Sequence, residues 1–473
     1  MYRHRRPSAA PQLILLALAG ILVGLAIAAF FGLPRVLAVS PQGGSASSRA
    51  PVTLSFNHPM DHASVESRLS IQPQAAGAVS WSGNELRFTP DGTWPPGTVA
   101  VSLASGGKTS RGLPMLFGRS WSFTTGAARV AYLLKTDDIA NVWAVPAEGG
   151  AATQLTSEAA GVDDFAVSPD GTQIVYAALR SDGGADLRRT SRDGGPATTV
   201  LACPTDLCSA PQFSADGAQL AFERSPMQPD GQTGDPKVQV LDLASGQLTI
   251  PAQDPTHTTR TPRFAADGRL AYLDSTLQAI AVFDFVSRTA TYIPNTSGEM
   301  GTWSPDGNFI VYPEIVFPPE PTPAPTVAGA IPKTPTAEPE NSDRFYSNLL
   351  RITVSTNKAD DLSGSNLVED ASPVYSPDGQ WLAFARKQLV QNQWTPGRQL
   401  WLMRADGQDA RALASDPFDN HSAFVWSPDS ARLVYMRFNV AAPNELPTVW
   451  IINTSGAGET ELAPGGYLPE WIP

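Results

Sequence analysis

Few residues in this sequence have the types and the spacing that chemistry needs. Three pairs of adjacent acids, Asp137-Asp138, Asp163-Asp164 and Asp360-Asp361, could offer carboxylate oxygens to calcium. Adjacent residues of an extended strand point to opposite sides, so the two carboxylates of a pair do not converge on one ion. We therefore expect solvated loop residues at these positions rather than a metal site.

Two histidines, His58 and His62, have the four-residue spacing that brings metal ligands together on a helix. Pro59 lies between them, and no third ligand is evident nearby. Because a structural or catalytic metal needs at least three protein ligands, we predict no metal site here and no bound cofactor.

Cys203 and Cys208 are the only cysteines of the chain. In an exported protein, two cysteines with four residues between them favour a small disulfide loop. A zinc site would need further ligands and a paired Cys-x-x-Cys spacing, which is absent.

No catalytic motif is present. The sequence lacks a Gly-x-Ser-x-Gly elbow, a phosphate-binding loop, a zinc motif and a Gly-rich nucleotide fingerprint. We therefore predict a protein that is not an enzyme and name no catalytic residue.

A repeated four-residue turn, Ser-Pro-Asp-Gly, organises the second part of the chain. Pro presets φ near −65°, Asp bonds back to the local backbone, and the closing Gly adopts a positive φ. Such turns join the two strands of a hairpin. The turn occurs at 168–171, 304–307 and 376–379, with degenerate copies at 214–217, 265–268 and 427–430.

Short strands flank each turn. The strand before it ends in an aromatic residue or Val, as at Trp303 and Trp426, and the strand after it is apolar at consecutive positions, as in Ile174-Val175-Tyr176. A strand that is apolar on both faces must be covered on both faces, as in stacked sheets. A period of about 40 to 50 residues with roughly four strands per unit is typical of a β-propeller. These repeats resemble the WD40-like repeats of TolB-type propellers over residues 128–473, and this resemblance implies the fold but almost nothing about function.

The two ends of the repeat region complement each other. Residues 130–156 supply three strands without a preceding turn, and residues 467–473 resemble the strand that precedes each turn. If they pair, the last strand completes the first blade and no open edge remains. We predict a seven-bladed propeller closed by the C-terminal strand; six blades would result if the weakly marked unit 257–297 does not form.

A proline-rich insertion, residues 313–345, interrupts the fifth unit between its second and third strands. Such a run cannot form ladder hydrogen bonds and has little to bury, so we expect an extended or disordered surface excursion. A docking arm is the functional alternative.

A ligand of the propeller is expected where each fourth strand leads into the next unit's first strand, at the mouth of the funnel. The residues due there are mostly acidic, which favours a cationic peptide or a metal ion, with an ordinary solvated rim as the alternative. They are Asp163, Asp164, Arg260, Glu299, Glu369, Asp370, Asn420 and His421.

Residues 39–126 read as short strands separated by turns, at the spacing of an Ig-like sandwich. The segments Phe56-Asn57-His58-Pro59-Met60-Asp61 and Trp121-Ser122-Phe123-Thr124-Thr125 resemble bacterial Ig-like domains of the S-layer type. We expect Trp81, Trp94 and Trp121 to pack in the core of this domain, with a sugar-stacking platform as the alternative.

The N-terminus predicts a membrane anchor. Gln12 to Leu33 is uncharged and largely apolar, and at 1.5 Å per residue it is long enough to cross a bilayer. Arg3, Arg5 and Arg6 precede it, so residues 1–11 stay in the cytoplasm, residues 12–34 span the membrane and the bulk is exported. A signal peptide cleaved after Ala38 is the alternative.

Composition limits the partners. The chain has 473 residues, 42% of them hydrophobic, and a formal net charge of −12, which allows large cores and more than one domain. An acidic chain without clustered Lys and Arg is a poor partner for nucleic acid.

The sequence therefore predicts an all-β protein with an N-terminal transmembrane helix, an Ig-like β-sandwich and a propeller. We expect a non-enzymatic binding or scaffolding protein of the bacterial envelope, whose propeller engages a protein or peptide. The alternatives are a propeller enzyme acting on glycans, as a lyase or hydrolase, and an envelope ligand sensor.

Overall fold

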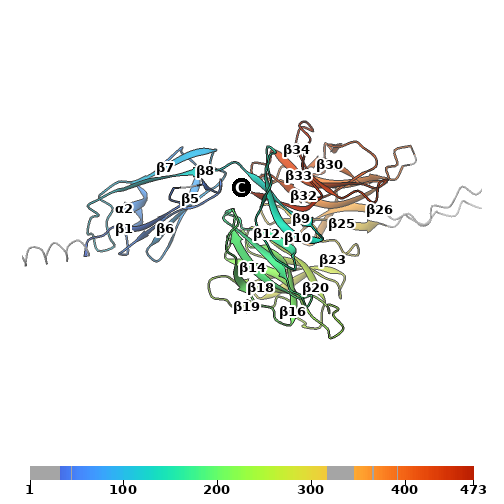
Figure 1. Ribbon diagram of the computed structural model, residues 1–473, viewed down its shortest axis with the longest axis horizontal. Helices are drawn as coiled ribbons and strands as arrows, with labels where there is room; N and C mark the ends of the chain where they lie inside the picture. Colours follow the sequence, from blue (N-terminus) through green and yellow to red (C-terminus); the bar gives the residue numbers. More distant parts are fainter. Residues whose placement is uncertain (1–31, 44, 317–345, 365–366, 391) are drawn as a thin grey trace, which may run out of the picture. The chain divides into compact units, whose positions relative to one another are not determined.

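The computed structural model describes residues 32–43, 45–316, 346–364, 367–390 and 392–473. The chain divides into two compact units, Met1–Gly126 and Ala127–Pro473 (Figure 1). The predicted membrane span, residues 12–34, lies outside the described residues except for its last three. Among the residues that are described, no helix is both long enough and apolar enough to cross a bilayer.

The smaller unit is a sandwich of two four-stranded sheets. One sheet contains, in spatial order, β1 (Val36–Ser40), β3 (Val52–Phe56), β6 (Glu85–Pro90) and β5 (Gly77–Ser82). The other contains β2 (Ser45–Ala46), β8 (Arg119–Thr125), β7 (Gly97–Leu103) and β4 (Leu69–Gln72). A short helix, α2 (His62–Glu66), is capped by Asp61, whose carboxylate accepts a hydrogen bond from the Ser64 N–H at 2.8 Å.

Alternating side chains of this sandwich form its core. Val52, Leu54 and Phe56 of β3 are buried, while the residues between them are partly exposed. Trp94 and Trp121 belong to the same core, so these two rings pack as predicted and offer no sugar platform.

The histidine pair does not share a helix face, because α2 begins at His62 and His58 precedes it. The His62 ring stacks on Trp81 with centroids 4.2 Å apart. The His58 ring nitrogen Nε2 lies 3.1 Å from the carbonyl oxygen of Gly32. Both rings therefore have structural neighbours.

The sandwich begins earlier than the predicted residue 39. β1 pairs with β3 from Val36↔Phe56 to Ser40↔Thr53. The Asn57 side chain accepts from the Arg35 N–H at 2.8 Å and donates to the Leu33 carbonyl at 2.9 Å. The Gly/Ser-rich stretch after β1 is also part of the fold, because β2 pairs with β8. Such short edge strands carry too little apolar pattern to be found in the sequence.

The larger unit contains three separate four-stranded sheets and two eight-stranded sheets. Each eight-stranded sheet consists of two groups of four strands joined by a single bridge, Ala185↔Leu207 in one and Ser347↔Glu369 in the other. The described residues of this unit thus form seven groups of four strands. Residues 257–297, the weakly marked unit, contribute one full group.

The groups follow one another along the chain. The first three are β9 (Arg129–Thr136), β10 (Ile139–Pro146), β11 (Thr153–Gln154) with β36 (Gly466–Ile472); β12 (Val162–Val167), β13 (Gln173–Leu179), β14 (Ala185–Ser191), β15 (Thr198–Leu201); and β16 (Asp206–Phe213), β17 (Gln219–Pro226), β18 (Lys237–Asp242), β19 (Leu248–Thr249). The next two are β20 (Thr259–Phe264), β21 (Leu270–Asp274), β22 (Ala279–Asp284), β23 (Thr289–Pro294); and β24 (Thr302–Trp303), β25 (Phe309–Val316), β26 (Tyr346–Thr353), β27 (Lys358–Asp361). The last two are β28 (Val368–Tyr375), β29 (Trp381–Gln388), β30 (Gln399–Arg404), β31 (Arg411–Ala412); and β32 (Asp419–Trp426), β33 (Arg432–Asn439), β34 (Thr448–Asn453), β35 (Thr460–Pro464).

The predicted hairpin turns are confirmed. Their closing glycines have φ between 64° and 88°, and Ser430, which replaces glycine in the last copy, has φ 60°. In the first copy the Ser168 hydroxyl donates to Asp170 at 2.8 Å and accepts from the Gln173 N–H at 3.0 Å. The same two bonds recur in the copies that begin at Ser214, Ser304, Ser376 and Ser427.

The strand after each turn is buried on both faces, as the sequence predicts. Ile174, Val175 and Tyr176 of β13 are at most 1% exposed. The aromatic residues before the turns connect adjacent groups: the Trp303 and Trp426 indole N–H groups donate to main-chain carbonyls of the preceding group's first strand, each at 3.1 Å.

The C-terminal strand lies in the first group. β36 pairs antiparallel with β9, with Tyr467 opposite Leu133 and Trp471 opposite Val130. Ile472 and Pro473 are buried, and Arg192 donates to the Pro473 carbonyl at 2.8 Å.

The predicted insertion falls mostly outside the described residues, which omit 317–345. Its expected start at Pro313 is wrong, because β25 continues to Val316. Pro313 lies opposite Leu349 and Val316 lies opposite Tyr346 in the ladder. A proline is tolerated in a strand where the partner strand does not need its N–H. The first proline of the Pro-rich run therefore still belongs to β25 and does not mark the start of the insertion.

Candidate functional site

The first strand of each group carries the features that build the candidate site; in the group of β9 this place in the sheet is taken by β36. In five of these strands a residue with φ between 48° and 53° interrupts the ladder, and the pairing register shifts at that point. A positive φ outside glycine is uncommon, and a bulge redirects the side chains that follow it. Five repetitions indicate that the fold imposes this kink. The kinked residues are Ala210, Thr261, Ser372, Ala423 and Leu468.

The kinked strands surround a hollow at the centre of the larger unit. It consists of two overlapping cavities of about 520 Å³ and 400 Å³, which share Thr261, Arg263, Ala423 and Phe424. Residues of β12, β16, β20, β24, β28, β32 and β36, or of the segments directly before them, line these cavities. The first strands of all seven groups therefore face one common space, which we call the axial cavity.

Four charged residues meet in the smaller of the two overlapping cavities: Asp164, Glu223, Arg263 and Glu470. We call them the axial cluster. Asp164 comes from β12, Glu223 from β17, Arg263 from β20 and Glu470 from β36, so four groups contribute one charge each. Three carboxylates face one guanidinium, which leaves an excess of negative charge when all are ionised.

Burial shifts the protonation of this cluster. It raises the pKa of Glu470 to about 7, against the opposing effect of Arg263, and raises the pKa of Asp164 to about 6, against a hydrogen bond from the Phe165 N–H. Burial also raises the pKa of Glu223, whose carboxylate accepts from the Thr261 N–H at 2.7 Å. Burial lowers the pKa of Arg263.

Glu470 is the least satisfied member of the axial cluster. Within the described residues, the carboxylate of Glu470 has no hydrogen bond from another side chain, and only the charges of Arg263 and Asp164 act on it. Carboxylates that share a cavity with excess negative charge attract an ammonium or guanidinium group. No three His, Cys, Asp or Glu side chains in the described part of the chain are placed to hold a metal ion.

Four of the predicted rim residues lie in or beside the axial cavity. Asp164 and Glu299 line it, and the Glu299 carboxylate accepts from the Ser372 N–H at 3.3 Å. Asp163 and Arg260 are exposed near the start of β12 and β20.

Glu369 and Asp370 are not rim ligands, which corrects the prediction. The Asp370 carboxylate is fully buried and receives two bonds of 2.6 Å from Arg386, and a third of 2.5 Å from Ser363. Glu369 is partly buried and pairs with Arg398 at 3.3 Å and Lys387 at 3.9 Å. Neither residue lines the axial cavity. Each has its ion-pair partners within its own group of strands.

Asn420 and His421 are also misplaced by the prediction. His421 is 1% exposed, and its Nδ1–H donates to the Arg398 carbonyl at 3.0 Å. Burial lowers the pKa of His421 to about 4, so its ring is neutral at physiological pH. The Asn420 side chain accepts from the Arg398 N–H at 3.2 Å. Both side chains fix the loop before β30 instead of facing a ligand.

Sequence reasoning missed three of the four members of the axial cluster. Arg263 and Glu470 each lie between a proline and an aromatic residue, in Pro262-Arg263-Phe264 and Pro469-Glu470-Trp471. One feature of the sequence could have identified them. Both are charged residues at a repeat position where β28 and β32 have Val374 and Val425. Glu223 follows an apolar strand run and carried a weaker version of the same signal.

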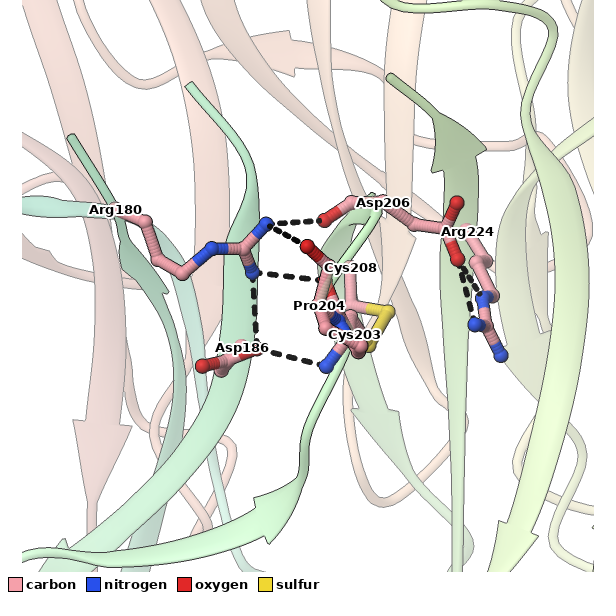
Figure 2. Close-up of a disulfide and its surroundings, with 7 residues drawn as sticks. All are labelled: Arg180, Asp186, Cys203, Pro204, Asp206, Cys208 and Arg224. Carbon is pink, nitrogen blue, oxygen red and sulfur yellow. Dashed lines mark hydrogen bonds and ion pairs between the residues drawn. A yellow bond between two sulfur atoms is a disulfide. The ribbon is translucent and has the colours of Figure 1, made fainter. Parts of the chain in front are cut away.

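The two cysteines form a disulfide that closes the turn between β15 and β16 (Figure 2). Cys203 and Cys208 are buried, and Arg180 donates to the Cys203 carbonyl at 2.8 Å. On the other side of the turn Arg224 pairs with Asp206 at 2.5 Å. The disulfide, the hydrogen bond and the ion pair stabilise this turn, which lies outside the axial cavity.

A comparison with protein families agrees with the architecture of the smaller unit. Residues 33–125 match the family model described as a bacterial Ig-like domain, and the smaller unit is such a domain. No curated protein sequence matches the chain.

Solved structures of propeller proteins are similar to the chain at low identity. TolB from Acinetobacter baumannii is 13% identical, with a TM-score of 0.43 over 86% of this chain and 83% of that one. The β-propeller domain of the Trilobed protease from Pyrococcus furiosus is 12% identical, with a TM-score of 0.46 over 64% of this chain and 85% of that one. Oligogalacturonate lyase from Vibrio parahaemolyticus is 15% identical, with a TM-score of 0.39 over 63% and 73%. Because the identities are 15% or less and the TM-scores lie below 0.5, we draw no conclusion about activity or partners from these neighbours.

Proposed function

We propose that this protein is a membrane-anchored, extracytoplasmic, non-enzymatic binding protein of the bacterial envelope. In this proposal the seven groups of strands are the blades of a propeller closed by β36, and the axial cavity receives a basic segment of a protein or peptide. The observation that carries the proposal is the axial cluster, in which three carboxylates with raised pKa values converge on one cavity.

The cost of withdrawing these carboxylates in part from bulk water argues for a ligand, since all three are partly buried. A buried charge is normally paired and hydrogen-bonded, and ionisable groups with strongly shifted pKa values concentrate at functional sites. A Lys or Arg side chain, or an N-terminal amine, would supply the missing positive charge. Such a ligand would also favour the ionised forms of Asp164 and Glu470.

The walls of the cavity suit a basic side chain. Phe264, Trp303 and Phe424 line it together with the charged residues. Lysine and arginine bury their methylene stems against apolar surfaces while the charged end reaches polar partners. A cavity of several hundred Å³ accommodates a few residues of an extended peptide.

The location outside the cytoplasm is part of the proposal. The apolar run Gln12 to Leu33 supports a membrane span, and a disulfide between Cys203 and Cys208 suits an oxidising compartment. The sandwich favours an uncleaved anchor over a signal peptide. Cleavage after Ala38 would remove Val36, which pairs with Phe56, and Arg35, which bonds to Asn57.

Binding of a fluorescein-labelled oligolysine peptide tests the proposal. We expect the full-length protein in detergent to bind it and to ignore an oligoglutamate peptide of equal length. Glu470→Gln and Asp164→Asn should each weaken binding about tenfold, because each removes a charge-assisted contact. Glu461→Gln, an exposed carboxylate on β35, is the matched control and should change nothing. Equal affinity for both peptides, or no effect of either variant in the axial cavity, would refute the proposal.

A propeller enzyme acting on glycans is the second candidate. Carboxyl groups with pKa values of about 6 and about 7 are suited to general acid and base catalysis at neutral pH. Turnover of a glycan panel by the wild-type protein, lost in the Asp164→Asn/Glu470→Gln double variant, would favour this candidate. Absence of turnover in both proteins favours the binding protein.

A further inference from the structure

The loop between β7 and β8 of the smaller unit presents apolar side chains to solvent. Leu113, Leu116 and Phe117 are 50%, 55% and 76% exposed. Three large apolar side chains within five residues form an exposed patch of the kind that marks an interaction surface.

This loop is held in a fixed shape. Met115 is buried in the core, and its N–H and carbonyl bond to Gly107 and Gly106, both at 2.7 Å. The Thr109 N–H donates to the Leu113 carbonyl at 2.9 Å. These contacts fix the loop, so Leu113, Leu116 and Phe117 remain exposed to solvent while Met115 packs in the core.

Basic residues flank the exposed apolar ones. Lys108, Arg111 and Arg119 are exposed, and residues 92–136 contain no acid. The acid that contacts the loop backbone is Asp61, whose N–H donates to the Lys108 carbonyl at 2.8 Å and whose carboxylate caps α2. The patch thus combines apolar groups with positive charge, as surfaces that bind anionic lipid do.

The loop lies at the end of the sandwich where the chain enters it. The Ser110 N–H donates to the Pro59 carbonyl at 3.0 Å, and the adjacent His58 contacts the carbonyl oxygen of Gly32 at 3.1 Å. Gly32 belongs to the end of the apolar run that predicts the membrane span. A bilayer crossed by that run would therefore lie within reach of this loop.

We propose that the loop of residues 108–119 is a second membrane contact, which inserts Leu113, Leu116 and Phe117 into the interface of an anionic bilayer. Lys108, Arg111 and Arg119 would then face lipid phosphates. The inference rests on the proposed membrane anchor and adds to it: two contacts would hold the Ig-like domain in a fixed orientation, where one helix alone would leave it free to swing.

A fluorescent label at the loop tests this contact. The only two cysteines form the disulfide, so Phe117→Cys can be labelled selectively with an environment-sensitive dye in the full chain. The protein is reconstituted into vesicles of phosphatidylcholine and phosphatidylglycerol, with and without brominated lipid as a quencher. Thr93→Cys is the matched control, since it is exposed in the same unit near the opposite end of β7.

We expect the label at residue 117 to shift to shorter wavelength and to be quenched by brominated lipid, whereas the label at residue 93 stays in water. Replacing Lys108, Arg111 and Arg119 with Gln should reduce the quenching in vesicles that contain phosphatidylglycerol. Equal solvent exposure of both labels overturns the proposal. A spectral shift without lipid quenching also overturns it, because it would indicate a protein contact, with a second copy or another chain.

Extraction of the same vesicles with alkaline carbonate before flotation separates this inference from the anchor, because it releases peripheral proteins and leaves spanning helices in the bilayer. If the protein no longer floats after extraction, the proposed anchor fails. Lipid quenching at residue 117 before extraction would then still support the loop contact, and its absence would refute that contact too.

Discussion

Two regions of the larger unit hold a carboxylate near an arginine, fully buried at Asp370 and partly buried at Glu470, and they differ in how the charge is satisfied. Asp370 receives three hydrogen bonds from Arg386 and Ser363, all between 2.5 and 2.6 Å. The charge of Arg263 lowers the pKa of Glu470, but Glu470 has no such hydrogen bonds among the described residues. The first arrangement is complete within the protein, and the second leaves a carboxylate open to the axial cavity. Our proposal of a ligand therefore rests on incomplete pairing at a cavity and not on burial alone.

Removing the strand that carries Glu470 should have the largest effect. Deletion of residues 467–473 exposes the edge of β9 and removes Trp471 and Ile472, which are 6% and 0% exposed. Loss of two such side chains costs about 6 kcal/mol or more. Calorimetry should show the transition of the larger unit lost and that of the Ig-like unit unchanged. An unaltered melting profile would contradict this account.

Breaking the complete pair should be the next largest effect. Asp370→Asn leaves Arg386 buried without its partner, which costs about 3–5 kcal/mol of unfolding free energy. Chemical denaturation followed by tryptophan fluorescence measures it. The Asp360→Asn variant is the control, because the Asp360 side chain is 43% exposed and lies 3.3 Å from Arg351 and 3.7 Å from Lys358. A change below about 1 kcal/mol at residue 370 would show that this pair is not structural.

Neutralising the incomplete carboxylate should act in the opposite direction. The pKa of Glu470 rises from its ordinary 4.5 to about 7 in the folded state, so its ionisation opposes folding. Below about pH 4.5 the group is protonated in both states, and the penalty grows as pH rises to about 7. At pH 8 Glu470→Gln should therefore be more stable than the wild type by about 2 kcal/mol, and at pH 4 the two should agree.

Denaturation at a series of pH values checks this sign. Glu461→Gln provides the baseline for an exposed carboxylate. A Glu470→Gln variant that is less stable than the wild type at pH 8 would place Glu470 in the same class as Asp370.

The smallest effect on stability is expected at Glu299, which lines the cavity but is exposed and accepts one bond of 3.3 Å. Glu299→Gln should leave the unfolding free energy within about 0.5 kcal/mol of the wild type. Its oligolysine affinity should fall about threefold, because a distant exposed charge contributes less than a buried one. Unchanged affinity would confine the ligand to the part of the cavity around Glu470.

The sequence predicted the repeating framework better than the site. The Ser-Pro-Asp-Gly turns depend on local backbone chemistry, and the apolar runs after them depend on burial, so both are visible in a single stretch of residues. The resemblance of residues 467–473 to the strand before each turn was equally local. By contrast, β1 and β2 are short edge strands whose partners lie more than ten residues away.

The site depends on contacts that no local pattern specifies. Glu369 and Asp370 are neighbours, yet adjacent side chains of a strand face opposite sides, and the partner that neutralises Asp370 comes from the next strand. Arg263 and Glu470 lie 207 positions apart (470 − 263) and meet only because the first strands of the groups face one cavity. The kink before each of them decides where the side chain points.

The pairing of β36 with β9 also sets an order of events during biosynthesis. β9 emerges from the ribosome long before β36, the partner strand with which it pairs. Until β36 has been made, one edge of the opening sheet has no neighbour of its own and could recruit a strand from another chain. A nascent chain that stalls before β36 would therefore be a candidate for aggregation, and a chaperone that covers β9 would have most effect at that moment.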